Sequence, residues 1–226
     1  MIIKKAVIVL GGIIKDYSFL AKNISLHASD DTILVAVDSG ANHLNEINVA
    51  PDLLIGDFDS ISSDSLEAFE LVEKISFPVE KDQTDGELAI REVIKRGCTL
   101  IILYGAGGGR TDHLLCNLML LELAASFIVA ARIENEGETI YLISNSCPSV
   151  PMLVDEKSII SLIPVSPVVS GITTFGLKYE LNNEKLERGS CRGISNVPVN
   201  AVGNTLVNVC VDDGKLLVIL NDNEVR

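Results

Sequence analysis

Hydrophobic residues recur in the first two thirds of the chain as short uninterrupted runs, separated by stretches in which apolar and polar residues follow a helical period. Such runs are typical of buried parallel strands, and such stretches are typical of amphipathic helices. The runs that predict strands are 6–10, 33–37, 53–55, 75–79, 100–104, 127–133 and 139–143, and the helical stretches are 19–27, 40–47, 63–74, 84–96 and 114–124. This alternation predicts an α/β fold with a mostly parallel, helix-flanked, Rossmann-like sheet.

The pattern changes near Cys147-Pro148, after which short β-rich runs alternate with turn residues and no helical period is evident. Asp213-Gly214 is typical of a hairpin turn. The chain is therefore predicted to have two domains, residues 1–147 and a small all-β sandwich or barrel over residues 148–226. The strands predicted in the second domain are 158–163, 168–174, 205–211 and 216–220.

Acidic residues gather near the ends of the predicted parallel strands. Asp57 and Asp59 follow the run 53–55, and in extended backbone alternate side chains project to the same side. Asp82 and Asp85 are three positions apart at the start of a helical stretch, which also places them near each other. Four close carboxylates repel one another unless a cation lies between them, and Mg²⁺ takes oxygen ligands that it shares with substrate phosphates. The set therefore predicts a magnesium site.

Each of these acids has a purely structural alternative. An Asp-x-Asp-Ser sequence after a strand is often a turn with a helix N-cap, and Asp82 alone could be a solvated loop acid. The capping box Thr84-x-x-Glu87 accounts for Thr84 and Glu87 without catalysis. Asp38 either caps the following helix or binds a ligand, and its place at a strand end favours the ligand.

A glycine-rich segment, Gly105-Ala106-Gly107-Gly108-Gly109-Arg110, follows the run 100–104. It does not match the dinucleotide fingerprint, because Arg110 stands where the third glycine is needed, and it lacks the Gly-Lys-Ser/Thr of a P-loop. Arg110 and Asp112 come just before an apolar helix, and helix-start amides beside a guanidinium suit a phosphate. His113 is interpreted as a packed histidine rather than a chemical group.

The composition of the chain limits the kinds of partner that it is expected to bind. The chain has 226 residues and a net charge of −13, which argues against nucleic acid and against an anionic membrane. The same charge would oppose a polyphosphate unless a divalent cation accompanied it. The five scattered cysteines, with no C-x-x-C pair, predict reduced core thiols in a cytoplasmic protein. The sequence predicts neither a signal peptide nor a membrane-spanning segment.

Five motifs, in their order along the chain, resemble those of the thiamine pyrophosphokinase family. No single motif is specific, but the ordered set covers nearly the whole chain. The motifs are Asp38-Ser39-Gly40-Ala41-Asn42, Gly56-Asp57-Phe58-Asp59-Ser60, Lys81-Asp82-Gln83-Thr84-Asp85, Gly108-Gly109-Arg110-Thr111-Asp112-His113, and Gly176-Leu177-Lys178-Tyr179-Glu180-Leu181 followed by Gly193-Ile194-Ser195-Asn196.

The resemblance implies that the first domain binds ATP and Mg²⁺ and that the second contributes to the thiamine site. It further implies a homodimer that transfers diphosphate from ATP to the hydroxyl of thiamine, giving thiamine diphosphate and AMP. On this basis magnesium is assigned to Asp57, Asp59, Asp82 and Asp85, one of which is also the base. The phosphates are assigned to Arg110, the nucleotide side to Asp38, Asn42 and Asp112, and thiamine to Gln83, Ser195 and Asn196.

Two alternative functions remain open at this point. The first is a Mg²⁺-dependent phosphohydrolase in which Asp57 is the nucleophile, since Asp-x-Asp after an apolar strand also marks aspartyl-phosphate enzymes. In such an enzyme, Asp82, Asp85 and Arg110 would have no function. The second is a non-catalytic nucleotide or vitamin sensor, against which the full set of acids argues.

Overall fold

The computed structural model describes residues 3–78, 82–200 and 202–222. The chain divides into two compact units, one ending at Glu136 and the other beginning at Gly137. The sequence pattern placed this division after residue 147, because the strand predicted over 139–143 was expected to complete the first sheet. In the structure this segment belongs to the second unit, where it pairs with the last strand of the chain.

The N-terminal unit is built on a sheet with the strand order β4-β3-β2-β1-β5-β6. All of its neighbouring strands are parallel, so the predicted parallel, helix-flanked sheet is confirmed. Because β2 to β4 extend to one side of β1, and β5 and β6 to the other, the strand order reverses between β1 and β5. The strands are β1 (Lys5–Val9), β2 (Thr32–Val37), β3 (Leu53–Gly56), β4 (Glu73–Ser76), β5 (Leu100–Tyr104) and β6 (Ala130–Asn135).

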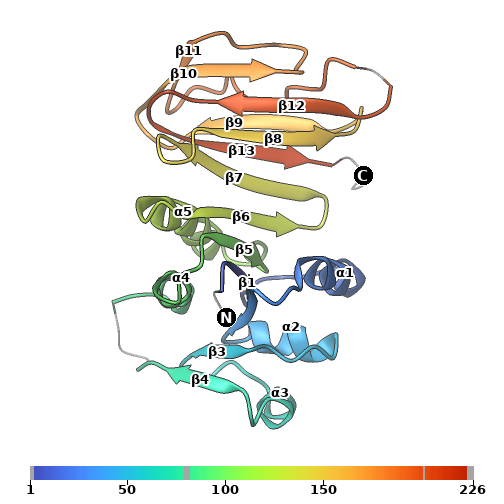
Figure 1. Ribbon diagram of the computed structural model, residues 1–226, viewed down its shortest axis with the longest axis vertical. Helices are drawn as coiled ribbons and strands as arrows, with labels where there is room; N and C mark the ends of the chain where they lie inside the picture. The colour runs from blue at the N-terminus through green and yellow to red at the C-terminus, as the bar shows by residue number, and fades with distance from the viewer. Residues whose placement is uncertain (1–2, 79–81, 201, 223–226) are drawn as a thin grey trace. The chain divides into compact units, whose positions relative to one another are not determined.

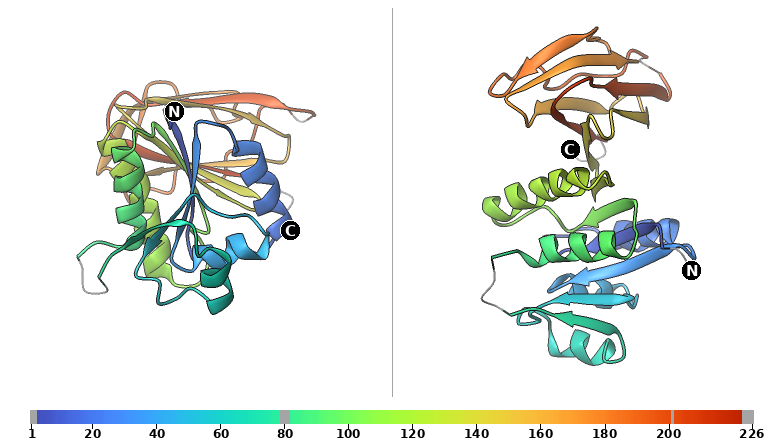
Figure 2. Two further views of the ribbon diagram at one scale, coloured as in Figure 1. Left: turned by 60° about the horizontal axis from the view of Figure 1, so that its bottom comes forward. Right: turned by 60° about the vertical axis from the view of Figure 1, so that its left-hand side comes forward.

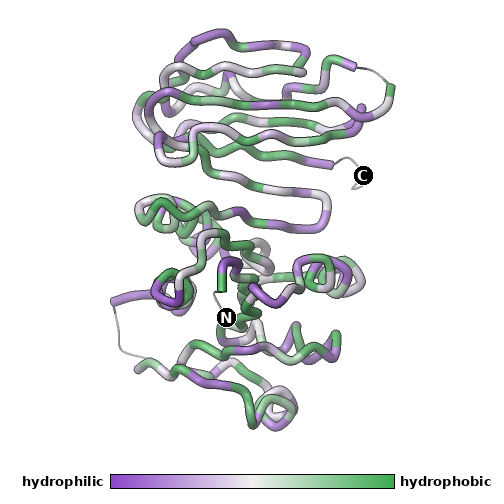
Figure 3. Tube along the Cα trace, viewed as in Figure 1, coloured by the Kyte–Doolittle hydropathy of each residue, from purple (hydrophilic) through white to green (hydrophobic). Residues whose placement is uncertain are grey.

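Helices cover both faces of this sheet, with α1, α2 and α3 on one face and α4 and α5 on the other (Figures 1 and 2). Alternate residues of β1, Val7 and Val9, are buried in one cluster with Leu20 of α1 and Leu44 of α2. Figure 3 shows the hydrophobic residues following the central strands, while the helices carry both kinds of residue. The helices are α1 (Tyr17–His27), α2 (Gly40–Glu46), α3 (Ser63–Ala68), α4 (Asp85–Lys95) and α5 (Thr111–Ser126).

Helix α4 begins and ends as its sequence predicts. The hydroxyl oxygen of Thr84 accepts a hydrogen bond from the backbone N–H of Glu87 at 3.2 Å, which satisfies one of the free donors at the helix start. After the helix, Gly97 has a φ of 95°, a left-handed conformation that favours glycine. The cap fixes Asp85 at the first helical position, beside the site described below.

The helix predicted over 63–74 is shorter than expected, since α3 ends before Phe69 and the edge strand β4 takes the last residues. The Lys74 ammonium donates to two backbone carbonyls at the end of the helix, at 2.7 and 2.8 Å. Leu71, which the helical period placed inward, is 98% exposed. The prediction was wrong because pairing with β3 draws this segment into the sheet.

The C-terminal unit is a β sandwich, as predicted. One antiparallel sheet has the order β7-β13-β9 and the other the order β11-β10-β12-β8. Buried residues of both sheets, among them Val207, Val209, Leu216 and Val218, form one core. The strands are β7 (Glu138–Ser144), β8 (Ser149–Val154), β9 (Ile159–Pro164), β10 (Val168–Phe175), β11 (Glu184–Glu187), β12 (Thr205–Cys210) and β13 (Lys215–Asn221).

Asp213-Gly214 does not form the predicted hairpin. Strand β12 pairs with β8 and β10, whereas β13 pairs with β7 and β9, so the segment between them passes from one sheet to the other. Asp213 forms an isolated bridge with Ser170 of β10, and Gly214 has a φ of 93°. The prediction was wrong because turn residues determine a local bend but not the partner of the next strand.

The five cysteines are all free thiols. Cys98 is buried, but Cys191 is exposed, so the description of all five as core thiols was wrong. In the part of the chain that the structure describes, no helix is both long enough and apolar enough to cross a membrane.

Candidate functional site

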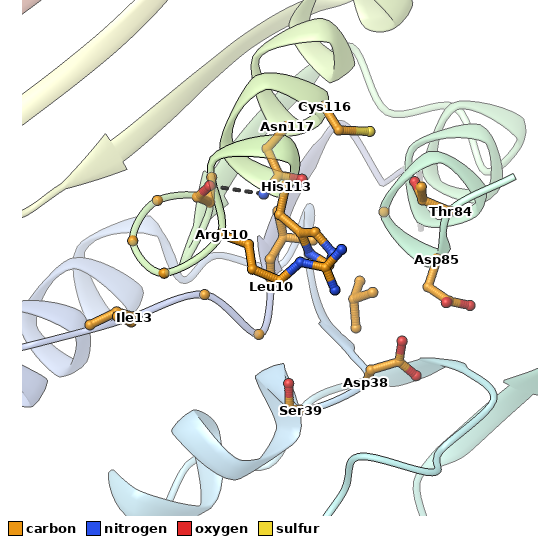
Figure 4. A pocket seen from close by; sticks show the side chains of 18 of the residues that line it. Leu10, Ile13, Asp38, Ser39, Thr84, Asp85, Arg110, His113, Cys116 and Asn117 are labelled. Atoms are coloured by element: carbon orange, nitrogen blue, oxygen red, sulfur yellow. Dashed lines mark hydrogen bonds between the residues drawn. The ribbon is translucent and has the colours of Figure 1, made fainter.

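A cavity of about 540 Å³ opens where the strand order of the N-terminal unit reverses. Its walls come from the loops that leave β1 and β5, from the carboxyl end of β2 and from the starts of α4 and α5 (Figure 4). In open α/β sheets, ligands bind at this crevice outside the carboxyl ends of the strands. The fold therefore places the cavity at the expected ligand site.

Two loops of glycine-rich backbone form one side of the cavity, which we call the glycine wall: Gly11-Gly12 after β1, and residues 105–109 after β5. The backbone N–H of Gly12 donates to the carbonyl of Gly105 at 2.8 Å, and that of Ile13 donates to the carbonyl of Gly107 at 2.9 Å. A Cβ on Gly12 would lie 2.2 Å from the Gly105 oxygen. Glycine is required here because the two backbones touch.

On another side of the cavity the carboxylates of Asp38 and Asp85 face each other, and we call this pair the acidic wall (Figure 4). Burial, followed by the charge and hydrogen bonding of Asp85, raises the pKa of Asp38 to about 7, and the charge of Asp57 adds to this rise. Three of the acids that the sequence singled out therefore lie close together. Asp38, which we assigned to the nucleotide, is at their centre.

Backbone in unusual conformations holds Asp38 in place. Asp38 itself has a φ of 46°, and Gly56, at the end of the neighbouring strand, has a φ of 149°. A Cβ on Gly56 would lie 1.7 Å from the Asp38 Oδ1 atom, so the carboxylate occupies the space that a side chain would need. Such strained positions at strand ends are common in functional sites.

Asp57 and Asp59 do not lie on one side of an extended strand as we expected. Phe58, between them, has a φ of 68°, so the backbone turns there and the alternation of side chains no longer applies. The Asp57 Oδ1 atom accepts a hydrogen bond from the backbone N–H of Asp59 at 3.1 Å, and Asp59 is exposed. The sequence pattern could not show this because β3 ends at Gly56.

Arg110 precedes α5 and lines the cavity, as the motif predicts. Its guanidinium donates to both oxygens of Asp112, at 3.1 and 2.6 Å, and this hydrogen bonding lowers the pKa of Asp112 to about 2. The Arg110 side chain is 72% exposed and that of Asp112 is 62% exposed. Asp112 therefore contacts Arg110, and only Arg110 of the two lines the cavity.

The remaining N-terminal candidates lie around the cavity rather than in it. Asn42 accepts from the backbone N–H of Ser62 at 2.9 Å and donates to the carbonyl of Ser60 at 3.2 Å, so it holds a loop of the cavity wall. Asp82 and Gln83 are exposed residues before α4. Lys81, part of the same motif, lies outside the described residues.

Sequence reasoning missed one face of α5. His113, Cys116 and Asn117 all line the cavity, and the Asn117 side chain donates to the carbonyl of Ala106 at 2.8 Å. His113 is exposed, so its interpretation as a packed histidine was wrong. The spacing i, i+3, i+4 on a helix that begins at the predicted phosphate site could have identified all three.

In the C-terminal unit the two candidate residues differ in what they contact. Ser195 is exposed, has a φ of 63°, and its backbone N–H donates to the Ser161 hydroxyl at 3.1 Å. The Asn196 side chain accepts from the backbone N–H of Tyr179 at 3.1 Å and donates to the Tyr179 carbonyl at 2.8 Å. Asn196 therefore holds the Tyr179 segment, while the Ser195 side chain faces solvent.

No group of three or more His, Cys, Asp or Glu side chains within residues 3–78, 82–200 and 202–222 has the arrangement of a metal site on its own. The acidic wall is a pair with Asp57 beside it, not the predicted cluster of four.

Both units of the chain match domains of known proteins. The family model of the thiamin pyrophosphokinase catalytic domain matches residues 24–130, and that of the vitamin B1 binding domain of thiamin pyrophosphokinase matches residues 149–215. A thiamine pyrophosphokinase of Bacillus subtilis is 29% identical over 186 residues, which cover 81% of this chain and 86% of the relative.

Solved structures extend the match over nearly the whole chain. A crystal structure of thiamine pyrophosphokinase from Bacillus subtilis has a TM-score of 0.82 at 28% identity, with 97% of this chain and 100% of that chain covered. One from Geobacillus thermodenitrificans has a TM-score of 0.79 at 29% identity, with 97% and 98% covered. With both domain models matched in order, and with residues of the four N-terminal motifs in or beside the cavity at the switch point of the sheet, the chain belongs to the thiamine pyrophosphokinase family.

Proposed function

We propose that the cavity binds ATP as its magnesium complex, with the phosphates between the glycine wall and the acidic wall. As a member of its family, the chain transfers diphosphate from ATP to thiamine and produces thiamine diphosphate and AMP. The observation that carries the assignment of the site is that one cavity combines glycine backbone, Arg110 and a carboxylate pair. Neither the phosphohydrolase nor the sensor receives support from the comparisons.

The acidic wall has the chemistry of a magnesium site. Mg²⁺ is usually bound by one or two carboxylates together with substrate phosphates. The carboxylates near Asp38, which raise its pKa, bring excess negative charge to this wall. A divalent cation would offset that charge. Asp38 and Asp85 would hold the ion, with Asp57 near them, and the bound ion would neutralise charge on the phosphates. Asp59 and Asp82, which are exposed, have weaker support.

The groups of the chain itself orient the reactants. Arg110 and the backbone amides of the glycine wall hold the phosphates in line with the thiamine hydroxyl. The hydroxyl oxygen forms a bond to the β-phosphorus, the bond from that phosphorus to the α,β-bridging oxygen breaks, and AMP leaves. A carboxylate of the acidic wall accepts the hydroxyl proton. Such a transfer needs alignment and charge neutralisation more than covalent chemistry from the protein.

For thiamine we propose direct contact with Ser195, whose exposed hydroxyl suits a ligand, and with Gln83. Asn196 would act by holding the Tyr179 segment. Ser195→Ala is expected to increase the KM for thiamine by a factor of between a few and about ten, because one hydrogen bond is lost. The KM for ATP should not change.

Thiamine titration of Ser195→Ala should accompany the kinetics, because KM need not equal Kd. Ser190→Ala, in the same loop, is the matched control, since the Ser190 hydroxyl accepts a hydrogen bond from the backbone N–H of Arg192 and is not a proposed thiamine contact. Unchanged thiamine binding with a lowered Tm would instead give Ser195 a structural role in its own loop.

A cytoplasmic homodimer is part of the proposal. Leu153 of β8 and Leu206 of β12 lie directly opposite each other on one face of their sheet and are 69% and 67% exposed. Exposed apolar side chains grouped in this way support association with a second copy, which light scattering at assay concentration would test. The free thiols support a reducing compartment.

The function is tested by incubating the purified chain with ATP, Mg²⁺ and thiamine and by identifying the products. AMP release that requires thiamine, with equal formation of thiamine diphosphate, is the expected result. Release of inorganic phosphate without thiamine would indicate the phosphohydrolase. Binding of either ligand without turnover would indicate the sensor.

A further inference from the structure

His43 links the first turn of α1 to the glycine wall. The Tyr17 hydroxyl lies 2.9 Å from the Nδ1 atom of His43, and the Nε2 atom lies 2.8 Å from the carbonyl oxygen of Gly12. A carbonyl only accepts, so Nε2 carries the proton, Nδ1 accepts, and the Tyr17 hydroxyl donates. The ring is half-buried, and burial lowers its pKa, which favours this neutral form.

The carbonyl that His43 holds belongs to a residue with little freedom to move. The Gly12 N–H is bonded to the Gly105 carbonyl, and its neighbour Ile13 is bonded to the Gly107 carbonyl. The Gly12 carbonyl and the Ile13 N–H belong to the same planar peptide, so the bond from His43 and the bond to Gly107 hold that one plane from its two edges. His43 thus bonds to the peptide through which the β1 loop contacts the β5 loop, although it does not line the cavity itself.

We propose that His43 is a positioning residue for the nucleotide, which holds Gly11-Gly12 in the orientation that presents this wall to ATP. The inference rests on the proposed ATP site. Without the bond from His43, only the bond from Ile13 to Gly107 would hold this peptide, so its carbonyl dipole would be freer to turn towards the cavity, where it would repel the phosphates. Tyr17 supports this role by fixing the tautomer of His43.

The test is titration with Mg²⁺ and α,β-methylene-ATP, whose bridging carbon prevents cleavage, together with steady-state kinetics. His43→Phe keeps a planar ring but removes the donor to Gly12. We expect both the Kd for the analogue and the KM for ATP to increase by a factor of between a few and about ten. The KM for thiamine should not change. His43→Gln, whose amide N–H reaches the place of Nε2, should restore most of the affinity, and Tyr17→Phe should give a smaller loss in the same direction.

His27→Phe is the matched control, because His27 is also half-buried but is bonded to Glu134, which does not line the cavity. It should leave analogue binding unchanged even if it lowers the Tm. A similar loss of analogue affinity in His27→Phe, or no rescue by His43→Gln, would assign His43 to general packing and overturn the proposal. Normal analogue binding by His43→Phe would also overturn it. Failure of the unmodified chain to bind the analogue would overturn the ATP site itself, and the inference with it.

Discussion

The two walls of the cavity are built in opposite ways. In the glycine wall, the backbone groups of Gly12 are paired within the chain, to Gly105 and to His43. In the acidic wall, the chain brings like charges together, and burial and Asp85 raise the pKa of Asp38 to about 7. The glycine wall is therefore formed by folding alone, whereas the acidic wall holds unfavourable charge that a bound cation would relieve. Interactions within the chain shape the first wall, whereas the proposed cation would complete the second.

Chelation of divalent metal should have the largest effect, because it would remove the cation that we propose for the acidic wall. We expect EDTA to abolish AMP formation and Mg²⁺ in excess over EDTA to restore it, since a chain of net charge −13 would not accept a polyphosphate unaided. Circular dichroism should show the same fold before and after chelation. Full activity in metal-free buffer would contradict the proposed magnesium site.

Replacing one carboxylate should have the next largest effect. Asp85→Asn is expected to lower kcat by about 10²–10³, the usual cost of losing electrostatic stabilisation of a transition state. The fold should persist, because Thr84 still caps α4. Asp64→Asn is the control, as Asp64 is an exposed residue in the first turn of α3. A kcat for Asp85→Asn equal to that of the control would leave Asp85 with a structural role only.

The pH dependence of the free energy of unfolding tests the charge repulsion within the acidic wall. The pKa of Asp38 is about 7 in the folded chain against an ordinary value of 3.8, so the folded state binds the proton more tightly. Its contribution to stability is present below pH about 4 and is lost as the pH rises to about 7.

We therefore expect the free energy of unfolding, measured in urea without metal, to fall between pH 4 and 8. The fall should be about 1–3 kcal/mol larger for the unmodified chain than for Asp38→Asn. This range is smaller than the full linkage value because Asp38 is only partly buried. Equal pH dependence in the two proteins would show that the carboxylates do not interact as described.

The glycine wall should respond to pH in the opposite direction and more weakly. Burial lowers the pKa of His43 below 6.5, so the stability that its neutral form provides is present above that pH and is lost as the pH falls. The groups bonded to the ring are the Tyr17 hydroxyl and the Gly12 carbonyl. Between pH 7 and 5 the urea midpoint should fall more for the unmodified chain than for His43→Gln. A larger fall in the variant would mean that His43 is charged in the folded state.

Local patterns in the sequence predict the elements of the N-terminal unit well, because caps and apolar runs act within a few residues. Thr84 and Gly97 delimit α4 from both ends, and their roles are confirmed. The end of α3 was not predictable in this way. Leu71 fits the helical period, yet pairing of the following residues with β3 leaves it exposed. Such pairing depends on a strand about twenty residues earlier, which no local window includes.

The candidate site shows the same limit. The motifs identify loops that form the cavity, since residues of each N-terminal motif lie in or beside it. The sequence paired Asp57 with Asp59, but the structure brings Asp38 together with Asp85, from segments that only the strand order makes neighbours. The positive φ of Phe58, which separates Asp57 from Asp59, has no residue-type signal because phenylalanine rarely adopts it.

Gly56 gives this arrangement an evolutionary consequence. The Asp38 carboxylate occupies the space of the missing Gly56 side chain, so the two positions form an epistatic pair. Any residue other than glycine at position 56 would displace Asp38 and remove its contribution, after which loss of the carboxylate itself would cost little more. Lineages that retain catalysis should therefore change neither position alone, although one is a charged group and the other has no side chain at all.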